Sequence, residues 1–148
     1  MEEKYIGIIE DTLVKTLNGE KAIKDLSVGD EIYTYCIDST NKELSSVTEK
    51  LNKGTQAVTK ISTVSHSIEA TNDQKFLVRT GDFNYEYKDL QELQVGDKLV
   101  IYSDAIVKTE TILTIESTGN KLVYNIIVES ANSNFYGNEM VIHDFSVY

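Results

Sequence analysis

The chain contains few side chains that could serve as a reactive nucleophile or a general base. Its one cysteine, Cys36, excludes an intramolecular disulfide, and with only two histidines, His66 and His143, a zinc site of cysteine and histidine is excluded too. Serine and aspartate are plentiful, but a hydrolase triad is a minor hypothesis because no Gly-x-Ser-x-Gly turn is present. We expect His66 to be exposed at a hairpin tip and Cys36 to be a small, buried apolar residue. No metal and no cofactor are expected.

Short segments rich in Val, Ile, Thr and Tyr must position these side chains. They alternate with Gly, Asn and Asp, and proline is absent, so the turns depend on those three residue types. Many short strands of this kind predict an all-β domain. Asn18-Gly19 between two apolar segments predicts a β-hairpin. The predicted strands include residues 31–35, 57–61, 98–102 and 122–128.

The chain contains an internal repeat. Residues 24–32 are echoed by residues 91–99, and both copies read Leu-x-Val-Gly-Asp before a strand that contains tyrosine. We interpret each copy as a short helical turn, a Gly-Asp turn and a strand, with glycine supplying the backbone freedom that the turn requires. A weaker echo pairs residues 68–72 with residues 128–132, and a strand containing phenylalanine follows each. Two copies predict a pseudo-two-fold β structure and are too few for a solenoid.

Length and charge limit the organisation and the partners of the chain. With 148 residues and no low-complexity tract, residues 1–148 are expected to form one domain. The polar stretch 38–53 is expected to be a long loop or a mobile hairpin, and residues 102–108 a second loop. A net charge of −10 argues against nucleic-acid binding. No apolar run approaches the roughly 18 residues of a membrane span, and Met1-Glu2-Glu3-Lys4 does not resemble a signal peptide. We expect a cytoplasmic monomer that binds neither nucleic acid nor membrane.

Four segments, in order along the chain, resemble the sequence blocks of inteins and related Hint domains. They span Gly7 to Asp144, which suits a mini-intein without a homing endonuclease. The resemblance implies the horseshoe-shaped, pseudo-two-fold Hint fold with short helical turns. It also implies autocatalytic protein splicing, in which an acyl shift is followed by cyclisation and cleavage at the C-terminal end. The segments are residues 10–14 with 18–19 and 23–30, residues 69–78, residues 123–128 with 134–138, and Val141-Ile142-His143-Asp144.

The resemblance places the upstream half of the reaction on residues that lack a nucleophile. Counted back from Thr12, the first nucleophile falls on Gly7, and glycine has no side chain with which to attack. Thr71 would polarise the upstream amide, with Asp73 as a supporting residue. Gln74 stands where the family has histidine, and its amide can donate a hydrogen bond but cannot shuttle protons near pH 7.

The downstream half keeps one catalytic side chain. His143 would donate to the carbonyl of the scissile bond, while Asp144 stands where asparagine is usual and would form a strained anhydride instead of a succinimide. Phe145 takes the place of the second nucleophile and cannot accept an acyl group. Ser133 replaces a second histidine of many inteins. Asn125, in the third block, is expected to support the site.

The combined losses predict that this form of the chain is splicing-blocked or degenerate, and that its activity is at most a single-turnover, autocatalytic one. Deliberate substitution at the junctions or natural divergence would explain them, and Gln74 and Ser133, which are not junction residues, favour divergence. The expected partners are the flanking host segments, or exteins. The tail 144–148 is faintly similar to a motif of family B DNA polymerases, which suggests such a host. The alternative is a non-catalytic β-domain for binding or assembly, with Gly7 and Asp144 on opposite faces.

Overall fold

A computed structural model describes residues 4–146, and the predictions that concern residues 1–3 and 147–148 lie outside that range. The prediction of an all-β domain is confirmed, since within the described range only two short 3-10 turns interrupt the strands. The elements are β1 Ile8–Ile9, β2 Leu13–Thr16, β3 Gly19–Ala22, η1 Ile23–Asp25, β4 Glu31–Cys36, β5 Asn41–Ser62, β6 Ser67–Ala70, β7 Lys75–Gly81, β8 Asn84–Asp89, η2 Leu90–Glu92, β9 Lys98–Ser103, β10 Ile106–Thr111, β11 Thr114–Val128, β12 Asn134–Gly137 and β13 Met140–His143.

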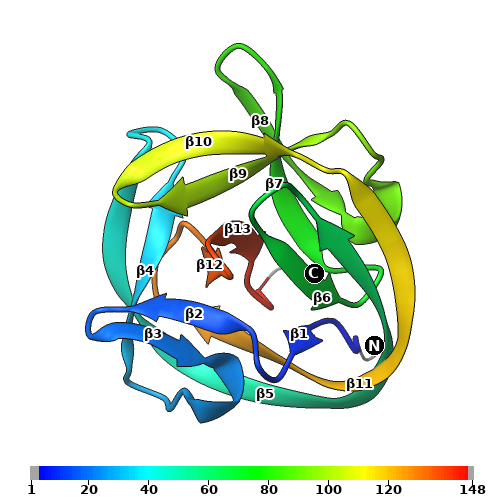
Figure 1. The fold of residues 1–148 in the computed structure, drawn as a ribbon. Helices are drawn as coiled ribbons and strands as arrows, with labels where there is room; N and C mark the ends of the chain where they lie inside the picture. Colours follow the sequence, from blue (N-terminus) through cyan, green and yellow to red (C-terminus); the bar gives the residue numbers. More distant parts are fainter. Residues whose placement is uncertain (1–3, 147–148) are drawn as a thin grey trace.

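The strands form one curled antiparallel sheet. Its order is β10-β9-β7-β13-β12-β2-β4-β5-β11-β1-β6, with β3 paired to β2 and β8 to β7. The two longest strands, β5 and β11, pair with each other from Thr114 opposite Ser62 to Val128 opposite Val47 and curve around the outside of the molecule, whereas β12 and β13 lie near its centre (Figure 1). Inner strands are therefore surrounded by a frame of longer ones.

The two copies of the repeat form equivalent turns, which supports the predicted pseudo-two-fold structure. η1 precedes the first Leu-x-Val-Gly-Asp segment and η2 precedes the second. In the first, the Asp30 carboxylate accepts the Ser27 N–H at 2.9 Å; in the second, the Asp97 carboxylate accepts the Gln94 N–H at the same distance. The glycine before each aspartate has a positive φ, 95° and 102°, which glycine adopts without a steric penalty.

Two groups of buried apolar side chains fill the sheet's interior. The larger group contains mainly aliphatic residues, which come from most of the strands. The smaller is rich in tyrosine, and burial raises the pKa of Tyr35 to about 12. Its buried members are Tyr35, Leu77, Val100, Tyr136 and Val141, with Tyr33, Ile37, Tyr85, Tyr87, Tyr102 and Val107 packed against them.

Three local predictions require correction, whereas the Asn18-Gly19 hairpin is confirmed as the connection of β2 to β3. Of the two forms expected for residues 38–53, the long loop is wrong, because most of these residues belong to β5, which forms a hairpin with β4 and also pairs with β11. Residues 102–108 are a tight hairpin whose turn residues, Asp104 and Ala105, both have positive φ. Cys36 is half-buried rather than buried.

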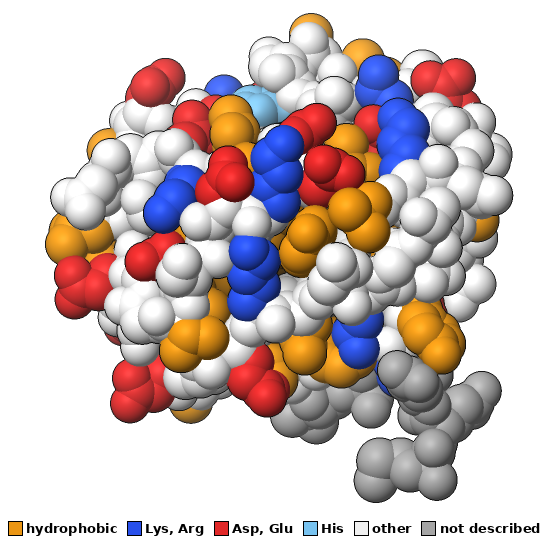
Figure 2. Space-filling model, turned by 90° about the horizontal axis from the view of Figure 1, so that it is seen from below, with side chains coloured by type: hydrophobic (Ala, Val, Ile, Leu, Met, Phe, Trp, Pro, Cys, Tyr) orange, Lys and Arg blue, Asp and Glu red, His pale blue; other side chains and the backbone are white. Residues whose placement is uncertain are grey.

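The surface mixes charges of both signs. On the face shown in Figure 2, Lys side chains are interspersed with Asp and Glu, and hydrophobic side chains are scattered among them. Lys121 and Glu69 form one of the ion pairs of the surface. Among residues 4–146, no helical segment has the length and apolar character that a membrane crossing would require.

Candidate functional site

The peptide group between Ile6 and Gly7 is hydrogen-bonded on both sides. Gly7 lies just before β1, which pairs with β11 and β6. The Asn125 amide nitrogen lies 3.1 Å from the Ile6 carbonyl oxygen, and the Gly7 N–H donates to the Thr71 hydroxyl at 3.1 Å. The Thr71 N–H in turn donates to the Gly7 carbonyl at 3.0 Å. The predicted upstream junction is thus a buried and fully bonded peptide, and even the Ile6 side chain is only 1% exposed.

The backbone leaves no room for a side chain at Gly7. A Cβ atom at this position would lie 2.6 Å from the Tyr124 carbonyl oxygen and 3.0 Å from its carbonyl carbon. Both atoms belong to the backbone of β11, so a rotamer change cannot relieve the contact. The close pairing of β1 with β11 therefore depends on glycine.

The downstream peptide group, between Asp144 and Phe145, is held in a comparable way. His143 Nδ1 lies 2.7 Å from the Asp144 carbonyl oxygen. Because a carbonyl oxygen only accepts, this contact places the proton on Nδ1. The Phe145 N–H donates to the Ile126 carbonyl at 2.8 Å. His143 is thus placed to polarise the carbonyl that the resemblance identifies as the scissile one.

The Asp144 carboxylate, which is completely buried, has donors on both oxygens. Oδ2 accepts the Val128 N–H at 2.9 Å, and Oδ1 accepts the Ser146 N–H at 2.9 Å as well as the Ser146 hydroxyl. Two backbone amides and one hydroxyl therefore donate to this one carboxylate. The side chain therefore anchors the outgoing segment.

Gln74 connects the two junctions. It is fully buried, and it lies in the turn between β6 and β7. Its amide nitrogen donates to the His143 carbonyl at 2.9 Å, and its amide oxygen accepts from the Asn125 side chain at 3.2 Å. Since Asn125 also holds the Ile6 carbonyl, we call Ile6, Asn125, Gln74 and His143 the junction relay. The relay and the contacts of Thr71 bring Gly7, Thr71 and His143 into one hydrogen-bonded group.

The remaining predicted residues lie at the edge of this group. Asp73 is half-buried and lines a shallow cleft with Lys4 and Tyr5, beside the upstream segment. Ser133 contributes its backbone, since its carbonyl accepts the Asp144 N–H at 2.9 Å. Phe145 lies under the Lys53 ammonium, 3.9 Å from the ring centroid.

Tyr87 is a neighbour of the site that the sequence did not single out. Its ring meets the His143 imidazole edge to face, with centroids 4.9 Å apart. Its hydroxyl accepts from the Asn134 amide at 3.0 Å, and burial raises the pKa of Tyr87. A tyrosine in a polar strand carries no signal of this role, because the contact depends on how β8 packs against β13.

His66 was expected to be exposed, and this expectation is wrong. Its side chain is only 12% exposed and both ring nitrogens contact carboxylates, those of Glu110 and Glu139. Because both ring nitrogens contact carboxylates, His66 is not placed to activate a serine and cannot be the general base of a hydrolase triad. Nor, within residues 4–146, do three or more His, Cys, Asp or Glu side chains gather in a way that could hold a metal ion.

Comparison with known proteins gives a consistent result for the fold. No family model and no curated protein matches the chain. Among solved structures, the DnaB intein from Synechocystis sp. PCC 6803 is similar with a TM-score of 0.84 and 24% identity, over 94% of this chain and 98% of that one. The DnaX mini intein from Spirulina platensis has a TM-score of 0.78 and 25% identity, over 93% and 99%. The bacterial intein-like domain from Clostridium thermocellum has a TM-score of 0.80 and 21% identity, over 96% and 100%.

These similarities show that the chain has the intein, or Hint, fold. Because nearly all of each neighbour is covered, and two of them are a mini intein and an intein-like domain, the chain has the extent of a mini-intein.

Proposed function

We propose that the chain is an intein-type protein-splicing domain whose splicing is blocked in this form. Residues 7–144 are the intein proper, and the segments on either side belong to the host protein. The junction relay carries the proposal, because it ties the Ile6 carbonyl to the His143 carbonyl through two buried amide side chains. A domain that acts on two peptide bonds in one reaction needs both of them in one site.

The upstream step lacks its reacting group. Thr71 and Asn125 hold the Ile6–Gly7 peptide as donors and acceptors that favour a polarised carbonyl. An acyl shift would require a hydroxyl or thiol on residue 7 to form a bond to the Ile6 carbonyl carbon as the bond to the Gly7 nitrogen breaks. Gly7 supplies neither, so the Ile6 acyl group stays on nitrogen.

The downstream step has its polarising group but a poor nucleophile. Attack of the Asp144 carboxylate on its own carbonyl carbon would release the Phe145 amine and leave an anhydride. Both carboxylate oxygens already accept hydrogen bonds from Val128 and Ser146, and these would have to break first. We therefore expect the natural chain to remain joined to both flanks.

The test is the intact mass of the chain expressed between two reporter domains with its own flanking residues. The natural chain is expected to give one mass, that of the unspliced fusion. A fusion with Gly7→Cys, Asp144→Asn and Phe145→Cys is expected to yield at least cleavage at the downstream junction. A ligated pair of reporters from the natural chain would overturn the proposed block, and an inert triple variant that is folded would overturn the splicing assignment.

The alternative of a non-catalytic β-domain predicted opposite faces for Gly7 and Asp144. Their connection through the relay favours the splicing domain instead. The proposal includes a cytoplasmic location, for which the single cysteine is the support. It includes a DNA polymerase host, for which the support is the tail that begins at Asp144.

A further inference from the structure

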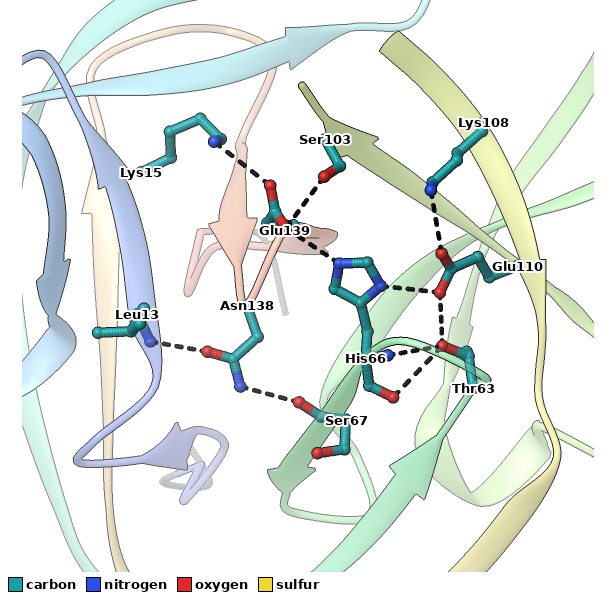
Figure 3. A network of polar contacts seen from close by, with 10 residues as sticks. All are labelled: Leu13, Lys15, Thr63, His66, Ser67, Ser103, Lys108, Glu110, Asn138 and Glu139. Carbon is teal, nitrogen blue, oxygen red and sulfur yellow. Dashed lines mark hydrogen bonds and ion pairs between the residues drawn. The ribbon is translucent and has the colours of Figure 1, made fainter. Parts of the chain in front are cut away.

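His66 lies between two carboxylates in a part of the molecule that the splicing proposal does not use. Nδ1 is 2.8 Å from the Glu110 carboxylate and Nε2 is 3.0 Å from the Glu139 carboxylate (Figure 3). The three side chains are 12%, 6% and 25% exposed. We call His66, Glu110 and Glu139 the His66 bridge.

The contacts around the bridge favour the ionised form of both carboxylates. Each oxygen that contacts His66 also accepts from a hydroxyl, that of Thr63 at 2.5 Å for Glu110 and that of Ser103 at 3.2 Å for Glu139. The second oxygen of Glu110 faces Lys108 at 3.4 Å, and that of Glu139 faces Lys15 at 3.6 Å. Both carboxylates are therefore acceptors only.

Two acceptor-only partners require an imidazole with two donors. A neutral imidazole has one N–H and one lone pair, so it would present a lone pair to one of the two carboxylates. Only the imidazolium satisfies both contacts. Without the proton on His66, the charges of Lys15, Lys108, Glu110 and Glu139 cancel, and the proton adds one positive charge in a chain of net charge −10.

The bridge fastens three separate segments. His66 lies in the connection between β5 and β6, Glu110 lies in β10, and Glu139 lies in the turn between β12 and β13. That turn is otherwise held by Asn138, whose amide joins the Leu13 N–H to the Ser67 carbonyl, and by backbone bonds to β2 and β9. Asn138 and Glu139 have φ values of 49° and 68°, so the turn has a left-handed conformation that other contacts must maintain.

We propose that the His66 bridge is a pH-sensitive strap, which holds the β12–β13 turn while His66 is protonated and releases Glu139 when the proton leaves. Glu139 directly precedes β13, and β13 ends at His143. Release of the strap loosens the strand that carries the downstream histidine. The strap is a property of the folded chain and does not depend on the splicing proposal.

The sign of the effect follows from the contacts. Burial alone would lower the pKa of His66, but the hydrogen bonds that its ring donates to Glu139 and Glu110 outweigh this effect and raise the pKa above 6.5. The strap therefore contributes fully below pH 6.5 and is lost as the pH rises through the pKa of His66 in the folded chain. Burial would raise the pKa of Glu139, but its bonds to His66 and Ser103 lower it, so the strap also weakens at strongly acidic pH.

The experiment is an NMR titration of the His66 ring in the natural chain, together with amide hydrogen exchange at Asn138 and Tyr102. The His66 ring is expected to titrate above 6.5, and Glu139→Gln is expected to lower this value by about one unit. Exchange, corrected for the intrinsic pH dependence, is expected to accelerate at least about threefold across the His66 titration in the natural chain and to stay flat in Glu139→Gln.

Glu86→Gln is the matched control, because it removes one negative charge at an exposed ion pair with Lys88 and leaves the bridge intact. It is expected to behave as the natural chain does. A ring that titrates at or below 6.5, or exchange that ignores the His66 titration, would overturn the strap. If Glu139→Gln fails to fold, the titration and exchange of the natural chain decide alone.

Discussion

The two proposed junctions are both held by hydrogen bonds, but each lacks a different part of the proposed reaction. At the upstream one, Thr71 and Asn125 bind the peptide group, while the position proposed for the nucleophile is Gly7, which has no side chain. At the downstream junction, His143 contacts the carbonyl and Asp144 has a side chain of the right length to reach it. In the proposed function, the groups that position each peptide bond are therefore distinct from the groups that would react with it, and this chain has the first set without the second.

The two positions also differ in how much the surrounding structure would have to change to accept a reactive side chain. Gly7 lacks both a side chain and the space for one, since a Cβ would lie 2.6 Å from the Tyr124 carbonyl oxygen. Asp144 differs from asparagine by one oxygen in place of one nitrogen. We expect the downstream half to be restored by one substitution and the upstream half to resist restoration.

The largest effect is expected from Asp144→Asn in a fusion with reporter domains. The new amide nitrogen attacks the carbonyl carbon of residue 144, the bond to Phe145 breaks, and its nitrogen leaves as an amine. Cleavage, followed by intact mass, is expected to be at least about 100-fold faster than in the natural chain. Gly7→Cys alone is expected to give no upstream cleavage with added thiol.

The control for this pair is the double variant Asp144→Asn with His143→Ala. It is expected to slow downstream cleavage by about 100-fold, because a positioned proton donor contributes about that much or more. Cleavage that ignores His143, or rapid upstream cleavage in Gly7→Cys, would contradict the contrast between the two junctions.

A smaller effect is expected on stability from Gly7→Ala. The added methyl group meets the β11 backbone, so the free energy of unfolding is expected to fall by about 1–3 kcal/mol in urea titrations. Gly81→Ala is the matched control, because its Cβ would face only the Asn84 side chain, which can move. The control is expected to stay within about 0.5 kcal/mol of the natural chain. Equal stability of the two variants would mean that β1 and β11 can separate freely.

The smallest effect is expected from Thr71→Val, which leaves the Gly7 N–H without its acceptor. Loss of this buried hydrogen bond is expected to cost about 1–2 kcal/mol in the same urea titration. Thr71→Ser keeps the hydroxyl and is expected to recover most of that loss. A Thr71→Val protein as stable as Thr71→Ser would show that the upstream peptide is held by Asn125 alone.

Features that repeat or turn locally were predictable from the sequence. The Leu-x-Val-Gly-Asp copies and the Asn18-Gly19 hairpin depend on neighbouring residues, and the structure forms each as a local unit. The grouping of Gly7, Thr71 and His143 followed from the resemblance. The donors and acceptors between them, such as the link from Gln74 to His143, required the structure.

The failures have a common physical origin in long-range packing. β5 is mostly polar because much of it faces solvent, so residues 38–53 resembled a loop although they pair with two other strands. His66 resembled an exposed tip because Glu110 and Glu139 lie 44 and 73 residues further along the chain. A local sequence pattern cannot predict contacts between residues this far apart in the chain.

The pairing of β11 has a consequence for the host protein that the splicing proposal implies. Ile8 lies opposite Tyr124 and the Phe145 N–H bonds to Ile126, so the chain enters and leaves within two residues of the same strand, about 7 Å apart along it. If the domain is inserted in a loop of a host protein, it holds the two ends of that loop close together. The loop-closure entropy of the inserted domain would then be little larger than that of a short host loop, whether or not the domain is spliced out.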